Sequence, residues 1–369
     1  MKIITNCFKP LTVLMFCFLY FLCGCTKEVI VNDLGDSFKY GPEEIAPGVM
    51  LGDVYATKNF ASFTDIAHYN KSWYVIFRAG TKHIGGLNGE IKIVKSDDAI
   101  TWTVQHIIEN DSLDLRDPKF VIDSANNNLY LNYTGVKYEA GGSKMYGFMA
   151  SYNSDIESWD SPQLITNDNT TGEQFVFWRL TYSKRKMYSA SFRTPLLGGY
   201  AKDNICLFNN NNNNDFKTYA TIGKLNLGNS PNEATIRFDV NDNMYFLIRR
   251  ETAHVALGFS TPVDYSNVKW IEDPLSTRLS SPNFLFYNNT KLLICGRDQN
   301  DLKFKFFSYN LTTNKIEKKF AFPSGDETGY GGMSFNPANK DELLISYYVI
   351  IGERSYIKLV RMNLKTFLQ

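Results

Sequence analysis

The chain has 369 residues, of which 44% are hydrophobic and 15% aromatic, and its 39 basic and 38 acidic side chains give a formal net charge of +1. This balance provides no polybasic surface, so nucleic acid is not expected as a partner. Of the six cysteines, only Cys206 and Cys295 lie beyond residue 25, both inside apolar runs, which leaves a disulfide between them open. The sequence contains no cluster of metal ligands, and we expect neither a metal ion nor a cofactor.

The first 25 residues have the organisation of a secretory signal. Lys2 and Lys9 precede or border an apolar run over residues 11–22, and small residues follow that run. The run is shorter than the ~20 apolar residues that a membrane span needs. Cleavage after this segment would remove both lysines and change the formal charge from +1 to −1.

The end of the segment, Leu22-Cys23-Gly24-Cys25, resembles the lipobox of bacterial lipoproteins, whose last cysteine receives a lipid and becomes the new N-terminus. The resemblance implies that residues 1–25 are a lipoprotein signal and that the lipid on Cys25 anchors the chain to the outer membrane, on its periplasmic or cell-surface face. An uncleaved anchor or an ordinary signal peptide is the alternative. Residues 26–48 mix charge, Pro and Gly without periodicity, so we expect a tether there.

Residues 49–369 contain strand-like runs rich in Phe, Tyr, Ile and Val, which recur about every 45–55 residues between Asn, Asp and Gly turns. Six sets are visible, and their second and third strands are 72–80 with 90–96, 129–135 with 146–153, 187–193 with 205–210, 244–250 with 255–260, 291–298 with 303–310, and 342–350 with 356–362. No helical pattern separates them. Six equal repeats predict one all-β domain, a six-bladed β-propeller, in preference to a two-sheet sandwich. A strand near 49–55 would complete the last blade.

A turn motif supports the propeller. The segment from Ser96 to Trp102 is similar to the Asp box of sialidase-type propellers, although Ala99 stands at the position of a Gly. In that turn an Asp caps backbone N–H groups, and the Trp packs between neighbouring blades. The resemblance implies a sialidase-like propeller. The box itself is structural and does not indicate catalysis.

Charged residues recur at one place in the repeat, near the inner strands, where apolar and small residues are usual. The set is Arg78, Arg116, Asp117, Arg179, Arg193, Glu233, Arg249 and Arg297, together with Trp178, which directly precedes Arg179. Structural salt bridges between blades are one interpretation. Because guanidinium groups bind carboxylate and sulfate in a bidentate manner, an anionic oligosaccharide ligand is the other.

The second half of the chain resembles sialidases more specifically. The segment 231–234, with Glu233, resembles the one that carries the glutamate polarising the nucleophile, and 329–331, with Tyr330, resembles the loop of the tyrosine nucleophile. Arg249 lies where the family has one arginine of its carboxylate-binding triad, and Arg297 lies near the third. The resemblance implies that Glu233 and Tyr330 are catalytic and that both arginines bind substrate.

The first half departs from that pattern. The stretch 62–66 lacks the first arginine of the triad, and Asp65 lies close to its place. The loop after Arg78 carries His83 and no acid where the family has an aspartic acid. His and Tyr can share the roles of base and acid in removing a proton next to a uronate carboxylate that arginines neutralise. This set resembles propeller-fold polysaccharide lyases and the oligosaccharide dehydratases of ulvan degradation, and His254 is a second candidate base.

Three hypotheses follow for the function. The first is elimination at the non-reducing uronate of an anionic, ulvan-like oligosaccharide, by a dehydratase or polysaccharide lyase. The second is an exo-glycosidase of sialidase type that uses Tyr330 and Glu233 as its nucleophile pair. The third is a non-catalytic glycan-binding lipoprotein. In each case we expect a monomer whose partners are the oligosaccharide and, through the lipid, the membrane.

Overall fold

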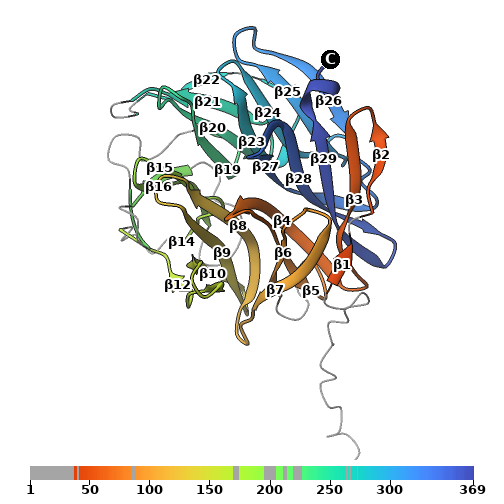
Figure 1. Ribbon diagram of the computed structural model, residues 1–369. Helices are drawn as coiled ribbons and strands as arrows, with labels where there is room; N and C mark the ends of the chain where they lie inside the picture. Colours follow the sequence, from red (N-terminus) through yellow and green to blue (C-terminus); the bar gives the residue numbers. More distant parts are fainter. Residues whose placement is uncertain are drawn as a thin grey trace, which may run out of the picture.

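The computed structural model describes residues 37–39, 41–84, 89–168, 174–194, 205–210, 214–218, 227–262, 265, 267–271 and 273–369. The described residues form six sheets, which follow one another in chain order around a common centre (Figure 1). This arrangement confirms the predicted all-β, six-bladed propeller. The signal segment and Cys25 lie outside the described residues, so the predicted lipidation is not addressed by the structure.

Each blade is described by its strands, beginning with the inner strand, and blades 1 to 3 come first in the chain. Blade 1 contains β4 (Phe60–Tyr69), β5 (Ser72–Gly80), β6 (Glu90–Ser96) and β7 (Thr101–Ile108). Blade 2 contains β8 (Asp114–Asp123), β9 (Asn128–Glu139), β10 (Gly142–Asn153), β11 (Ser158–Trp159) and β12 (Gln163–Leu164). Blade 3 contains β14 (Gln174–Val176), β15 (Thr181–Ser183), β16 (Lys186–Thr194), β17 (Ile205–Asn209), β18 (Asp215–Thr218) and β13 (Thr166–Asn167).

The remaining blades follow the same plan. Blade 4 contains β19 (Pro231–Phe238), β20 (Met244–Arg250), β21 (Ala256–Ser260) and β22 (Lys269–Ile271). Blade 5 contains β23 (Leu279–Asn288), β24 (Lys291–Asp298), β25 (Phe304–Asn310) and β26 (Lys315–Ala321). Blade 6 contains β27 (Glu327–Asn336), β28 (Asn339–Ile351) and β29 (Arg354–Asn363), and a short helix α1 (Leu364–Phe367) ends the chain. Each pair of runs found in the sequence forms the second and third strand of one blade.

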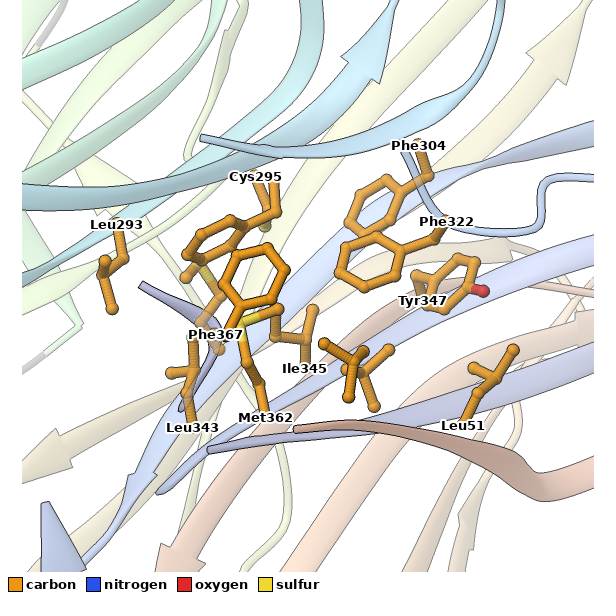
Figure 2. Close-up of a cluster of buried hydrophobic side chains, with 14 of the residues drawn as sticks. Leu51, Leu293, Cys295, Phe304, Phe322, Leu343, Ile345, Tyr347, Met362 and Phe367 are labelled. Atoms are coloured by element: carbon orange, nitrogen blue, oxygen red, sulfur yellow. The ribbon is translucent and has the colours of Figure 1, made fainter. Parts of the chain in front are cut away.

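The N-terminal strand β3 (Val49–Thr57) completes blade 6 by pairing with β29, from Thr57 opposite Ser355 to Val49 opposite Met362. This confirms the strand expected near 49–55. Figure 2 shows the apolar cluster that holds it, in which Leu51 of β3 lies near side chains of blades 5 and 6. Burial of these side chains joins the two ends of the chain and closes the ring of blades.

Two short strands precede β3, within the segment expected to be a tether. The strand β2 (Glu43–Ala46) pairs with β3, and β1 (Ser37–Lys39) pairs with β7 on the outer edge of blade 1. These pairings supply partners for backbone groups at the edges of two sheets. Two strands therefore lie within residues 26–48, ahead of β3.

The Asp box has the geometry that its sequence predicts. The Oδ1 atom of Asp98 accepts hydrogen bonds from the backbone N–H groups of Ile100 at 2.7 Å and Thr101 at 2.8 Å. Ala99 has a φ of 55°, in the left-handed region that favours glycine. Trp102 is buried in a cluster that combines side chains of blades 1 and 6. The turn therefore fixes the contact between two blades.

The described residues contain two cysteines. Cys206 and Cys295 are both buried, lie in blades 3 and 5 respectively, and form no disulfide. No group of three or more His, Cys, Asp and Glu side chains among the described residues has an arrangement that could hold a metal ion. No helix within these ranges has the length and hydropathy of a membrane span.

Candidate active site

Backbone irregularities in the inner strands gather polar residues at one end of the propeller. Five inner strands shift register near their beginning, after Ser62 in β4, Arg116 in β8, Pro231 in β19, Ser280 in β23 and Gly329 in β27. Four residues inside these shifts have φ between 49° and 59°, namely Phe63, Asp117, Ser281 and Tyr330. Left-handed backbone in bulky residues is unfavourable and concentrates at functional sites. The same feature in adjacent blades indicates a site at this end of the central channel.

The centre of this cluster is a hydrogen bond between Tyr330 and Glu233. The hydroxyl of Tyr330 donates to Glu233 Oε1 at 2.8 Å. The other carboxylate oxygen, Oε2, accepts from the Arg249 guanidinium at 3.0 Å and from the Ser281 backbone N–H at 2.6 Å. Arg249 also contacts Glu251, at 2.8 Å. Every oxygen of Glu233 is therefore directed by a specific donor, which fixes the carboxylate against Tyr330.

Tyr330 is held by its backbone as well as by its side chain. Its N–H donates to Ser281 Oγ at 2.9 Å, and its carbonyl oxygen accepts from Thr64 Oγ1 at 2.8 Å. The ring packs edge-on against Phe63, with 4.5 Å between ring centroids. These contacts from blades 1 and 5 explain how the positive φ of Tyr330 is maintained.

The pKa values of this pair move in opposite directions. Burial raises the pKa of Tyr330 well above its usual value, and the negative charge of Glu233 raises it further. Burial also acts to raise the pKa of Glu233, but the charge of Arg249 and the hydrogen bonds to the carboxylate outweigh it, so this pKa lies below its usual value. Tyr330 therefore keeps its proton while Glu233 is ionised.

His83 belongs to a second polar group at the same end. Its Nδ1 atom lies 2.8 Å from Glu327 Oε1, which also accepts a hydrogen bond of 2.7 Å from the Tyr348 hydroxyl. The His83 ring packs against Phe63, which contacts Tyr330 as well. Its side chain is 34% exposed. The arrangement leaves Nε2 of His83 as the atom that can exchange a proton with a ligand.

Asp117 and two arginines contribute buried polar atoms without a partner. Among the described residues, Asp117 Oδ1, Arg116 Nε and Arg297 Nε are buried and make no hydrogen bond. Burial raises the pKa of Asp117, which the charge of Arg116 only partly opposes. The Arg116 guanidinium lies 5.0 Å from the centroid of the Phe63 ring, and Arg297 donates to the Thr328 carbonyl at 3.4 Å. Unpaired buried donors of this kind are costly unless a ligand uses them.

Lys119 is a member of the site that the sequence analysis missed. Its ammonium group is buried 5.5 Å from the centroid of the Trp178 ring and 5.8 Å from that of Tyr330. Burial, together with the charge of Arg179, lowers the pKa of Lys119 to about 8. A lysine on an inner strand, directly before the apolar run 120–122 of β8, was the available signal in the sequence.

Two of the predicted substrate ligands serve the fold instead. Arg78 is 0% exposed, and its Nε and NH2 atoms donate to Asp114 Oδ1 at 2.9 and 2.7 Å, while NH1 donates to the Lys82 carbonyl. A guanidinium enclosed in this way cannot touch a sugar. Trp178 is also buried, beneath Tyr330, at 6.4 Å between ring centroids. Its role is to support the tyrosine rather than to contact substrate.

Asp65 and Arg179 correct the prediction for a further pair. They form a buried salt bridge across the channel, with NH1–Oδ2 at 2.9 Å and NH2–Oδ1 at 3.3 Å. Asp65 Oδ2 also accepts from the Phe120 backbone N–H at 3.0 Å. The bridge joins blades 1, 2 and 3 and engages both carboxylate oxygens of Asp65 and both terminal nitrogens of Arg179, whose Nε has no partner among the described residues. Structural salt bridges, the alternative considered from the sequence, account for these residues.

His254 and Arg193 are the remaining residues predicted for the site. His254 follows β20 and lines a different pocket, where its Nδ1 atom lies 2.7 Å from Asp273 Oδ1. It is therefore not a base for chemistry at Tyr330. Arg193 is half-buried on β16 opposite Phe175, and a contact with substrate stays a prediction for it.

Solved structures with this arrangement of blades are similar over most of the chain. A Hadza microbial sialidase has 10% sequence identity and a TM-score of 0.63, and the match covers 83% of this chain and 66% of that one. The fold is that of the sialidase-type propellers. A protein of unknown function from Dyadobacter fermentans has 16% identity and a TM-score of 0.69, with coverage of 86% and 100%. An α-L-arabinofuranosidase from Fusarium graminearum has 12% identity and a TM-score of 0.63, with coverage of 91% and 100%.

The sialidase-type fold is all that these comparisons establish, since the identities lie between 10% and 16%. No protein-family model and no curated protein sequence matches the chain. The chain spans 66% of the length of the Hadza sialidase. A shared scaffold does not determine chemistry, so the function has to be argued from the site itself.

Proposed function

We propose that this protein is a glycosidase that cleaves an anionic sugar from the end of an oligosaccharide, with Tyr330 as nucleophile. The observation that carries the proposal is the 2.8 Å hydrogen bond from the Tyr330 hydroxyl to Glu233 Oε1. Hydroxyl nucleophiles are activated by an adjacent group that accepts their proton, and that group is itself oriented by a third. Arg249 and the Ser281 N–H take the third role here. Two of the similar structures, a sialidase and an arabinofuranosidase, are also glycosidases.

The reaction would take place in two steps. In the first, the Tyr330 oxygen attacks the anomeric carbon while its proton passes to Glu233 Oε1, and the bond from that carbon to the leaving oxygen breaks. In the second, a water molecule attacks the anomeric carbon and gives its proton to the group that protonated the leaving oxygen, while the bond to the Tyr330 oxygen breaks and Glu233 returns its proton to that oxygen. Retention of configuration at the anomeric carbon follows from two displacements.

The leaving oxygen needs a proton, and two groups of the site are suited to supply it. Asp117 has an unpaired buried oxygen and a raised pKa, which favours its protonated form. His83 is more exposed, and Glu327 orients its ring. Aspartic acid and histidine side chains are both common general acids. Substituting Asp117 and His83 in turn identifies the one that supplies the proton.

An anionic substrate is supported by Arg116 and Arg297. Each has a buried Nε atom without a partner among the described residues. A carboxylate or sulfate placed between two such groups would accept charge-assisted hydrogen bonds from both. Arg249 contributes less to binding, because its guanidinium already contacts Glu233 and Glu251.

Substituting Tyr330→Phe tests the proposal. Loss of a well-placed nucleophile should lower kcat by about a thousandfold or more, because a positioned group has an effective molarity of ~10⁵ M or higher. The matched control is Tyr287→Phe, since the Tyr287 hydroxyl donates to Asp341 at the same distance of 2.8 Å, at the opposite end of β23 from Ser281. The substrates are aryl glycosides of uronic and sialic acids. Turnover by Tyr330→Phe at the level of Tyr287→Phe would refute the mechanism.

Elimination at a uronate is a second candidate, favoured by His83 and its contact with Glu327. His83 Nε2 would remove the proton next to the carboxylate, and Tyr330 would protonate the leaving oxygen. The product is a conjugated unsaturated uronate, which absorbs in the ultraviolet, whereas products of hydrolysis do not. New absorbance that disappears in His83→Gln would establish elimination. Reducing sugar released without new absorbance would exclude it.

For the N-terminal segment we propose a lipid anchor on Cys25 at the outer membrane. The basis is the lipobox-like sequence that ends at this residue. Expression in a bacterium fed labelled palmitate should label the wild-type chain but not Cys25→Ser. Equal labelling of both would refute the anchor.

A further inference from the structure

A second polar pocket lies beside the candidate active site on blade 4. It has a volume of about 630 Å³, within the range of sites that hold small ligands. Its polar and aromatic lining comes from the loop after β20, from β22 and from the segment before β23: Arg250, Thr252, His254, Trp270, Asp273 and Arg278.

Consecutive residues of β20 connect the pocket to the active site. Arg249 and Arg250 are consecutive on β20, and consecutive side chains of a strand point to opposite faces. Arg249 reaches Glu233, whereas Arg250 donates from Nε to the His254 carbonyl at 2.7 Å and lines the pocket. Glu251, next in sequence, contacts Arg249. Arg250 also pairs with Pro231, two residues before Glu233, so the pocket and the Tyr330–Glu233 pair lie at the same end of blade 4.

The chemistry of the lining suits a charged sugar. Arg278 Nε is buried and has no hydrogen-bond partner among the described residues, so the guanidinium has a donor available. His254 is oriented by Asp273, at 2.7 Å, and is 44% exposed. Trp270 is half-buried and presents an aromatic surface of the kind on which sugar rings stack. An oxyanion beside a flat apolar face is the ligand that this combination fits.

We propose that this pocket binds the next sugar unit of the substrate, and that this unit carries a carboxylate or a sulfate recognised by Arg278. The inference rests on the proposed function, because it assigns a neighbouring position on the same oligosaccharide. It also provides a role for His254, as a ligand-contacting residue rather than a base. The substrate class is thereby an oligosaccharide with acidic groups on at least two adjacent sugars.

Direct binding tests the pocket independently of catalysis. Calorimetric titration of Tyr330→Phe would use three tetrasaccharides, namely an oligogalacturonate with carboxylates only, a carrageenan fragment with sulfates as its only anionic groups, and neutral cellotetraose. We expect one or both acidic tetrasaccharides to bind, and Arg278→Gln in the same background to weaken that binding about tenfold or more, as loss of a hydrogen bond to a charged group does. The matched control is Arg185→Gln, the same change at an exposed turn between β15 and β16. Which of the two acidic fragments binds identifies the anionic group.

Kinetics in the wild-type background separate this inference from the proposed function. Arg278→Gln should raise KM for an oligosaccharide substrate and leave the cleavage of a monosaccharide aryl glycoside unchanged, since the latter does not reach the pocket. His254→Gln, a second variant at a more exposed position, should act in the same direction. Acidic and neutral tetrasaccharides binding alike, or binding unaffected by both substitutions in correctly folded protein, would overturn the inference. A fully active Tyr330→Phe would overturn the proposed function while leaving the binding result intact.

Discussion

Replacing Arg78 by methionine tests whether the arginines of the inner blades divide into structural and ligand-binding groups. Arg78 is fully buried, and the change removes its hydrogen bonds to Asp114 Oδ1 and to the Lys82 carbonyl. Asp114 keeps only the Gly89 N–H at 2.8 Å and the Tyr138 hydroxyl at 3.0 Å. A carboxylate left buried without its cation costs about 3–5 kcal/mol. Because two neutral donors remain, we expect a loss near 3 kcal/mol.

Equilibrium unfolding in urea, followed by tryptophan fluorescence, measures this loss. The double variant Arg78→Met with Asp114→Leu should recover most of it, because replacing both members of a buried ion pair by apolar side chains is often neutral. Arg297→Gln is the contrasting variant, since Arg297 is half-buried with an unpaired Nε. It should change the unfolding free energy by less than about 1 kcal/mol and raise KM about tenfold. If Arg78→Met were as stable as wild type and instead raised KM, the division would be wrong.

Two further substitutions probe the titration of the site and the turn between blades. Burial raises the pKa of Asp117, so the folded protein becomes less stable as pH rises above the usual carboxyl range. Asp117→Asn should therefore unfold at a higher urea concentration than wild type at pH 7, but not at pH 3. If Asp117 is the acid, Asp117→Asn should cleave substrates with poor leaving groups far more slowly than wild type does. If the variant matched the wild-type rate for every leaving group, His83 would be assigned as the acid. Asp98→Ala removes the cap of the Asp box and should destabilise the protein by about 1 kcal/mol, as loss of a capping side chain does. Because backbone hydrogen bonds to Thr101 and Ile100 lower the pKa of Asp98, this difference should shrink as pH falls below the carboxyl's usual range, and a constant difference would refute the capping account.

The sequence predicted some residues of the site correctly and assigned others to it wrongly. Glu233 and Tyr330 were identified from short segments similar to sialidases, and the structure brings them into contact although 97 positions separate them. Arg78 has the same place in the repeat as Arg297, near the end of the second strand of its blade, yet it is enclosed in a salt bridge, as are Asp65 and Arg179 on the inner strands. A repeat position predicts the blade and the strand of a side chain. It does not predict the partner that occupies its guanidinium.

The sequence by itself determined the propeller. Alternating strands, Asn and Gly turns and the capped Asp box are local features, because each depends on residues a few positions apart. The closing strand β3 could be expected for the same reason, as an apolar run left over at the start. Only the tertiary structure decided which polar residues form the site. The register shifts of five inner strands, the left-handed backbone of Asp117 and Tyr330 and the burial of Lys119 between two rings depend on packing between different blades, which no short stretch of sequence contains.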